Sequence, residues 1–191
     1  KRPDEALTSF QRIDDLIGRM GAITRQLKSY ARKGGEDLIA VDVRSAIDGA
    51  LEIMEPQLKA RQISISKTLP IEPVFILGDQ LRLEQVMVNL VRNALDATST
   101  VVLPEIEILL LADETAILTV RDNGEGISDL NELFEPFFTT KKPGDGVGLG
   151  LAISTGIITD LGGRLVARNG SAAGAVFQVT LPIIKNSMNE V

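Results

Sequence analysis

The stretch EQVMVNLVRNALDAT (Glu84–Thr98) carries two asparagines, four residues apart, inside a helical pattern. Residues at this spacing lie on the same face of a helix, so Asn89 and Asn93 share a face that would otherwise be apolar. Amide groups near a core need hydrogen bonds or a ligand, and an amide oxygen is a hard, neutral donor suited to Mg²⁺. The alternative interpretation is a pair of satisfied surface asparagines.

A second polar stretch, DNGEGI (Asp122–Ile127), follows a predicted strand. A carboxylate at the buried end of a strand only accepts hydrogen bonds, so Asp122 could receive an exocyclic amine such as that of adenine. Gly124 and Gly126 permit a positive φ angle or a close approach of the backbone. The alternative is a plain Asp-Asn-Gly turn, which is the commonest use of these residues.

The glycines of GDGVGLGLAI (Gly144–Ile153) recur at every second position, directly before a predicted helix. Their N–H groups can face phosphate oxygens, and the N-terminus of the helix adds partial positive charge. Lys141 and Lys142, just upstream, can supply mobile positive charge. The pattern is neither the G-x-x-x-x-G-K-[ST] phosphate loop nor the dinucleotide fingerprint, and a flexible surface loop is the alternative.

Between these two glycine-rich stretches lies FEPFFTTK (Phe134–Lys141). We interpret Phe134, Phe137 and Phe138 as core anchors that hold the base of the following loop, in preference to direct ligand contact.

Composition limits the possible functions. The chain has 191 residues, 44% of them hydrophobic and 24% charged, which suits one domain of about 150 residues with an appendage. It contains no cysteine and no histidine, so disulfides, thiolate metal sites and imidazole ligands are excluded. A net charge of −6 argues against nucleic-acid binding. Since no apolar run reaches the roughly 18 residues that span a bilayer, we expect this stretch to be soluble and cytoplasmic.

Residues 1–33 show the 3-4 apolar spacing of one long amphipathic helix, which the pair Gly34-Gly35 ends. The stripe is wide enough for a helix packed in a bundle, although an ordinary core-facing helix is the alternative. Beyond it, helices and strands arrive in blocks rather than in strict alternation. We therefore predict an α+β fold, a two-layer sandwich with a mixed β-sheet and helices on one face.

The order and spacing of the four motifs resemble the ATP-binding catalytic domain of sensor histidine kinases, within the wider group that includes gyrase, Hsp90 and MutL. The resemblance covers residues 38–182. Residues 1–33 look like the second helix of the dimerisation and histidine-phosphotransfer hairpin. The helix text ITRQLKSYARK and the NLVRNALDAT box are most similar to sensor kinases of C4-dicarboxylate transport and nitrogen regulation.

The resemblance implies an organisation, with residues 1–35 as the hairpin helix, 36–185 as the catalytic domain and 186–191 as a tail. It also implies that Asn93, with Asn89, holds Mg²⁺ on the triphosphate of ATP. Asp122 takes the adenine amine and Gly126 lines the base, and Gly124 is also among the implied nucleotide-binding residues. The residues implied around the phosphates are Lys141, Gly144, Gly146, Gly148, Leu149 and Gly150.

Two departures from the family pattern affect these roles. Many relatives place a basic residue three positions after the second asparagine, where this chain has Asp96. Phosphate charge must therefore be met elsewhere, with Arg92 and Lys141 as candidates. The late G-T-x-F pattern appears as Gly174-Ala175-Val176-Phe177, without the threonine.

The implied reaction is transfer of the ATP γ-phosphoryl group to a histidine for relay to a response regulator. Because this sequence has no histidine, the acceptor must lie on another segment, and these residues alone should not autophosphorylate. The parent is expected to be a homodimer of the bacterial inner membrane, attached only through upstream segments. The alternatives are an ATP hydrolase of the same fold group and a non-catalytic module that binds nucleotide to change shape. The hydrolases carry a glutamate where this chain has Asn89, which cannot accept a proton.

Overall fold

The computed structural model describes residues 38–140 and 147–184. The helix expected over residues 1–33, the tail at 186–191, and Lys141, Gly144 and Gly146 lie outside the described residues. The elements, in chain order, are β1 (Ile39–Asp42), α2 (Val43–Ala60), β2 (Ser64–Thr68), β3 (Phe75–Gly78), α3 (Gln80–Ala97), β4 (Glu105–Ala112), β5 (Thr115–Asp122), α4 (Gly150–Asp160), β6 (Arg164–Asn169) and β7 (Ala175–Pro182).

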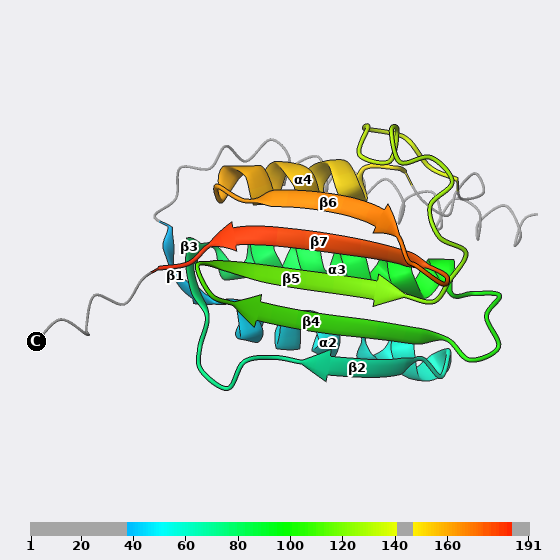
Figure 1. The fold of residues 1–191 in the computed structure, drawn as a ribbon, viewed down its shortest axis with the longest axis horizontal. Helices are drawn as coiled ribbons and strands as arrows, with labels where there is room; N and C mark the ends of the chain where they lie inside the picture. The colour runs from blue at the N-terminus through cyan, green and yellow to red at the C-terminus, as the bar shows by residue number, and fades with distance from the viewer. Residues whose placement is uncertain (1–37, 141–146, 185–191) are drawn as a thin grey trace, which may run out of the picture.

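Five strands form one mixed sheet in the order β2-β4-β5-β7-β6 (Figure 1). The β2–β4 pair is parallel, and the other three pairs are antiparallel. The helices lie behind this sheet in the view of Figure 1, with α3 crossing behind β5 and β7. The predicted α+β sandwich with a mixed sheet and helices on one face is therefore confirmed.

Alternation along the strands explains why the helices cover one face. In β4, Ile106, Ile108 and Leu110 are buried, while the residues between them are exposed or half-buried. Successive strand side chains point to opposite faces, so these three side chains belong to the face that α3 covers. Fully buried helix residues such as Met87 and Leu90 of α3 complete the core. Strand side chains that repeat every two residues and helix side chains that repeat every 3.6 residues thus pack together in one core.

Both long helices begin at aspartate caps. The Asp42 carboxylate accepts a hydrogen bond from the Arg44 backbone nitrogen (3.1 Å) at the start of α2. The Asp79 carboxylate accepts one from the Arg82 backbone nitrogen (3.1 Å) at the start of α3. Each cap satisfies a backbone donor that the first helical turn leaves unpaired, and so sets where the helix starts.

The first and third strands form a sheet of their own, an arrangement that strand patterns alone did not predict. β1 pairs antiparallel with β3, from Ile39 opposite Gly78 to Asp42 opposite Phe75. This ribbon is also tied to the helical layer, because Val43 N donates to the Val74 carbonyl oxygen (2.9 Å) at the start of α2. The ribbon leaves β2 as the edge of the main sheet.

Candidate functional site

Asp122 is the last residue of β5 and is one of three buried polar or charged residues among those described, with 3% of its surface exposed. Its Oδ1 accepts hydrogen bonds from the backbone nitrogens of Gly124 (2.8 Å) and Ala175 (3.2 Å). Both hydrogen bonds from the described residues go to this one oxygen. Among the described residues none donates to Oδ2, so Oδ2 is the carboxylate oxygen that could accept from a ligand.

Burial raises the pKa of the Asp122 carboxyl above its ordinary value of 3.8, and its hydrogen bonds from the Gly124 and Ala175 backbone oppose that shift. Desolvation disfavours the charged form, so the carboxylate costs the folded state free energy at neutral pH. A buried acid with a raised pKa and an oxygen open to ligand is more typical of a binding site than of a plain turn.

Lowering the pH is expected to weaken ADP binding through Asp122. The ionised carboxylate is the stronger acceptor for the adenine amine, and the raised pKa moves the loss of binding to higher pH than an ordinary aspartate would. The test is the ADP dissociation constant measured from neutral pH downwards, for the wild type and for Asp122→Asn. The nucleotide itself titrates in the same way with both proteins. The difference between their two pH curves therefore reports the contribution of Asp122. Parallel curves would contradict the assignment.

Gly124 lies against the C-terminal end of α3. A Cβ atom at this position would stand 2.4 Å from the Ala97 carbonyl oxygen, and the Glu125 backbone nitrogen donates to that same oxygen (3.3 Å). Only glycine permits this approach, so the turn after β5 is held onto the helix that carries the two asparagines.

We expect Gly124→Ala to lower the free energy of unfolding by about 1–3 kcal/mol, the usual cost of overpacking. Gly156, within α4, is a matched control because a Cβ added there meets nothing within 4 Å. Gly156→Ala should instead raise stability by about 0.5–1 kcal/mol through helix propensity. Denaturant unfolding of the two variants checks the prediction, and equal changes in stability would contradict the close contact with Ala97.

The other end of the turn is held by a residue that the motifs did not indicate. Gly126 has φ +78°, and next to it Ile127 exchanges two hydrogen bonds with the side chain of Asn169, at the end of β6. The two segments lie 42 residues apart in the chain. No local pattern marks Asn169. Its place directly before a glycine was the only available signal.

The phenylalanine motif meets the second glycine stretch at Gly148. The Phe137 backbone nitrogen donates to the Gly148 carbonyl oxygen (2.9 Å). Gly148 has φ +71°, and a Cβ atom there would stand 2.4 Å from the Phe138 carbonyl oxygen, so the contact requires glycine. The backbone of the motif thus holds the start of the α4 segment.

The prediction that all three phenylalanines are core anchors is wrong for Phe137. Its side chain is 67% exposed, and its own φ is +69°. Phe134 is half-buried and packs on the core, as predicted, and Phe138 is half-buried. The left-handed backbone conformation at Phe137, adopted where its N–H reaches Gly148, accompanies a side chain that does not enter the interior.

Leu149 and Gly150 form the start of α4. Leu149 occupies the N-cap position with 7% of its surface exposed, and its own side chain makes no capping hydrogen bond. The first N–H groups of α4 therefore receive no acceptor from their N-cap residue, an arrangement that suits phosphate or another anion.

Asn89 connects α3 to α4. Its Nδ2 donates to the Gly150 carbonyl oxygen (3.1 Å) and to the Ser154 hydroxyl oxygen (3.1 Å). Ser154 is fully buried, so this hydrogen bond also satisfies a core hydroxyl. The amide nitrogen is thus used within the protein, and Oδ1 is the atom that could face a metal ion. This structural role was not predicted from the sequence.

Asn93 is half-buried on α3, one helical turn beyond Asn89. Its role as a metal ligand stays a prediction. Among the described residues no group of three or more His, Cys, Asp or Glu side chains could hold a metal ion. A divalent ion at this site would therefore depend on amide oxygens and on the phosphates of the ligand, which is a coordination that Mg²⁺ commonly adopts.

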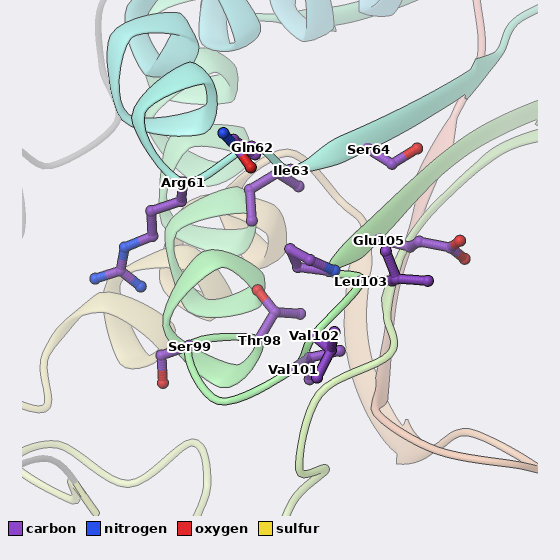
Figure 2. A pocket seen from close by; sticks show the side chains of 11 residues that line it. Arg61, Gln62, Ile63, Ser64, Thr98, Ser99, Val101, Val102, Leu103 and Glu105 are labelled. Atoms are coloured by element: carbon purple, nitrogen blue, oxygen red, sulfur yellow. The ribbon is translucent and has the colours of Figure 1, made fainter.

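A hollow of about 590 Å³ lies elsewhere, where the C-terminal ends of α2 and α3 approach the starts of β2 and β4 (Figure 2). Arg61, Thr98 and Leu103 are among its lining residues, and the Arg61 guanidinium donates to the Leu95 carbonyl oxygen (3.1 Å). None of the predicted site residues lines it. The candidate site is instead the region around α3 where the turn after β5 and the start of α4 converge.

Residues 78–185 match the family described as histidine kinase-, DNA gyrase B-, and HSP90-like ATPase. The matched residues include Asn89, Asp122 and Gly150. The chain belongs to this family. The predicted resemblance to sensor histidine kinases is thereby confirmed.

Two relatives within the family are C4-dicarboxylate transport sensor proteins named DctB. The chain is 36% identical over 185 residues to the protein of Pseudomonas aeruginosa, covering 95% of this chain and 30% of the relative. It is 39% identical over 181 residues to that of Rhizobium meliloti, covering 92% and 28%. The chain thus spans less than a third of either relative.

Among solved structures, the catalytic domain of histidine kinase ThkA in a nucleotide-free form superimposes with a TM-score of 0.68. The sequences are 28% identical, and the match covers 76% of this chain and 95% of that domain. Residues of the described fold therefore correspond to a complete family catalytic domain. In residues 38–140 and 147–184, every helix is too short or too polar to cross a membrane.

Proposed function

We propose that this chain binds ATP and transfers its γ-phosphoryl group to a histidine carried by another segment, as the catalytic part of a two-component sensor kinase. The observation that carries the proposal is Asp122. It is a buried carboxylate with Oδ1 held by two backbone N–H groups and Oδ2 left to accept from a ligand. Family membership supports ATP as that ligand.

The phosphates would lie toward the start of α4. The first N–H groups of α4, which Leu149 does not cap, and the backbone of Gly148 and Gly150 supply donors and partial positive charge there. We further propose that Lys141, Gly144 and Gly146 contribute to the same phosphate site. Positive charge from lysine would offset the absence of a basic residue at Asp96.

Mg²⁺ would be held by the amide oxygens of Asn93 and Asn89 and by the phosphates. When bound, the ion neutralises phosphate charge and fixes the geometry of the transferred group. For Asn89 the donor is Oδ1, because Nδ2 already donates to Gly150 and Ser154. The Asn89 nitrogen therefore bonds to the protein, and its oxygen would bond to the ion.

The same hydrogen bonds favour phosphoryl transfer over rapid hydrolysis. A hydrolase needs a general base to activate water, and an amide that donates to two protein acceptors cannot act as one. Transfer to a presented nucleophile depends mainly on positioning and charge neutralisation, which this site can supply without a base at Asn89.

The finer organisation is part of the proposal. Residues 1–35 would form a helix of a dimerisation hairpin, and residues 36–185 the catalytic domain. The histidine-bearing helix would be the immediate partner, with a response regulator as the next acceptor and a homodimer as the assembly of the full-length protein. Membrane attachment would reside in segments other than these residues.

Calorimetric titration tests nucleotide recognition directly. The chain should bind ADP and ATP in the presence of Mg²⁺, and bind IDP more weakly, because IDP lacks the exocyclic amine that Asp122 would accept. Removing Mg²⁺ with a chelator should weaken ATP binding more than ADP binding, since the third phosphate adds charge to be neutralised. Equal affinity for ADP and IDP, or no binding of either, would overturn the proposal.

A further inference from the structure

We propose that Asn169 is a positioning residue that sets nucleotide affinity and discrimination for adenine, by holding the backbone of the turn after β5 at the distance from Asp122 that the base requires. This inference rests on the proposed function.

The contact is reciprocal. The Asn169 Oδ1 accepts a hydrogen bond from the Ile127 backbone nitrogen (2.7 Å), and its Nδ2 donates to the Ile127 carbonyl oxygen (3.0 Å). One side chain thus satisfies both backbone groups of one residue in the loop, and fixes its position and its orientation together. No other residue type of this size offers a donor and an acceptor in that geometry.

The amide also lies against Gly126. A Cβ atom on Gly126 would stand 2.9 Å from Asn169 Oδ1, so the turn passes close to this side chain. Gly126 adopts φ +78°, a conformation that glycine holds without steric strain but does not favour on its own. The hydrogen bonds to Ile127 select one conformation of a flexible segment.

The hairpin that begins at Asn169 also holds Asp122. In the turn between β6 and β7, Gly170 N donates to the Gly174 carbonyl oxygen (2.8 Å), and Ala175 N donates to Asp122 Oδ1 (3.2 Å). A Cβ atom on Gly174 would stand 1.9 Å from the Asp122 carbonyl oxygen, which shows how closely the hairpin abuts β5. The β6–β7 hairpin therefore holds both ends of the turn after β5, the Asp122 carboxylate at one end and Ile127 at the other.

Because Asn169 is exposed, we expect it to position the turn rather than to stabilise the fold as a whole. The side chain and both hydrogen bonds to Ile127 are exposed, and exposed hydrogen bonds add little to global stability because water replaces them. The local geometry of the turn, by contrast, decides whether the backbone can face the base while Asp122 Oδ2 meets its amine.

The chain contains a matched control in the same turn. Asn123 also makes two side-chain hydrogen bonds to backbone, but to two residues of another segment: it accepts from Glu105 N (2.9 Å) and donates to the Leu103 carbonyl oxygen (2.8 Å). Asn123→Ala removes as many hydrogen bonds as Asn169→Ala but leaves the contact with Ile127 in place. The two variants should therefore differ in nucleotide recognition and agree in stability.

The test measures the dissociation constants of ADP, IDP and tripolyphosphate for the wild type, Asn169→Ala, Asn169→Asp and Asn123→Ala, with thermal unfolding in parallel. Asn169→Ala should weaken ADP binding about fivefold to thirtyfold, because the turn must then be ordered when the base binds, and narrow the preference for ADP over IDP. Tripolyphosphate affinity should not change. Asn169→Asp keeps the acceptor for Ile127 N but loses the donor, so its ADP affinity should fall between those of the wild type and Asn169→Ala.

Three outcomes would overturn the inference while leaving the proposed function intact. ADP affinity of Asn169→Ala could stay within twofold of the wild type. ADP and tripolyphosphate could weaken equally, or Asn123→Ala could narrow the ADP preference as much as Asn169→Ala does. If Asn169→Ala does not fold, Asn169→Asp decides the question by the same comparison. A wild-type chain that binds no ADP would instead overturn the proposed function, and this inference with it.

Discussion

Asp122→Asn should reduce ADP affinity about tenfold to a hundredfold, the usual effect of losing a hydrogen bond to a charged group. The variant can keep both protein contacts, because an amide oxygen at Oδ1 still accepts from Gly124 N and Ala175 N. The amide nitrogen then replaces Oδ2 and presents a donor to the adenine amine. Calorimetry with ADP measures the loss, and tripolyphosphate affinity should stay as in the wild type.

Stability distinguishes this effect from unfolding. Burial raises the pKa of Asp122, so the folded state loses stability as the pH rises from the ordinary value of 3.8 through the raised pKa. At neutral pH that cost is fully present, and a neutral asparagine removes it. The thermal midpoint of Asp122→Asn should therefore equal or exceed that of the wild type.

Asp129→Asn is the matched control. Its Oδ1 also accepts from two backbone nitrogens, those of Asn131 (2.9 Å) and Glu132 (3.3 Å). It lies in the loop that follows the turn after β5, and no role in binding is assigned to it. ADP affinity should not change in this variant. Unchanged ADP affinity in Asp122→Asn would remove that residue from the site.

Joining the chain to a histidine-bearing helix should produce the other large effect, from no phosphohistidine to a readily labelled product. Incubated alone with Mg²⁺ and ATP, the chain should gain none, because its 191 residues contain no histidine. The helix can be fused ahead of Lys1 or supplied as a separate partner. In the transfer a P–N bond forms at the imidazole, the P–O bond to the β-phosphate breaks, and ADP leaves with that electron pair.

The product of this transfer has a chemical signature. A phosphoramidate is labile to acid and stable to base, so the label should be lost on acid treatment. It should also vanish in Asn93→Asp and in Asp122→Asn, which alter the proposed ion and base contacts. If the fused protein binds ATP tightly but its histidine is never phosphorylated, the kinase proposal is wrong. A module that binds nucleotide only to change shape would then be the better account.

Much of the fold was predictable from local sequence patterns. The apolar alternation of β4 and β5 is visible in the sequence itself, and so is Asp79, the capping residue directly ahead of α3. The four motifs, in order, indicate the family that residues 78–185 match. These features depend on neighbours along the chain, since the periods of helices and strands and the chemistry of caps are local.

Contacts between distant segments were decided by the tertiary structure. Strand patterns could not show that β1 and β3 form a separate ribbon, because both read as ordinary strands. Likewise, the three phenylalanines look equivalent in sequence, yet the hydrogen bond from Phe137 N to Gly148 accompanies a left-handed backbone that leaves that side chain exposed.

The sequence by itself determined which elements form, which family the chain belongs to, and which residue types could meet a nucleotide. Only the tertiary structure decided how those residues are held. Asn89 donates to a residue 61 positions away, and Asn169 pairs with one 42 positions away. The physical reason is that a hydrogen-bond partner is chosen by distance in space, which packing of the whole domain establishes and no local period encodes.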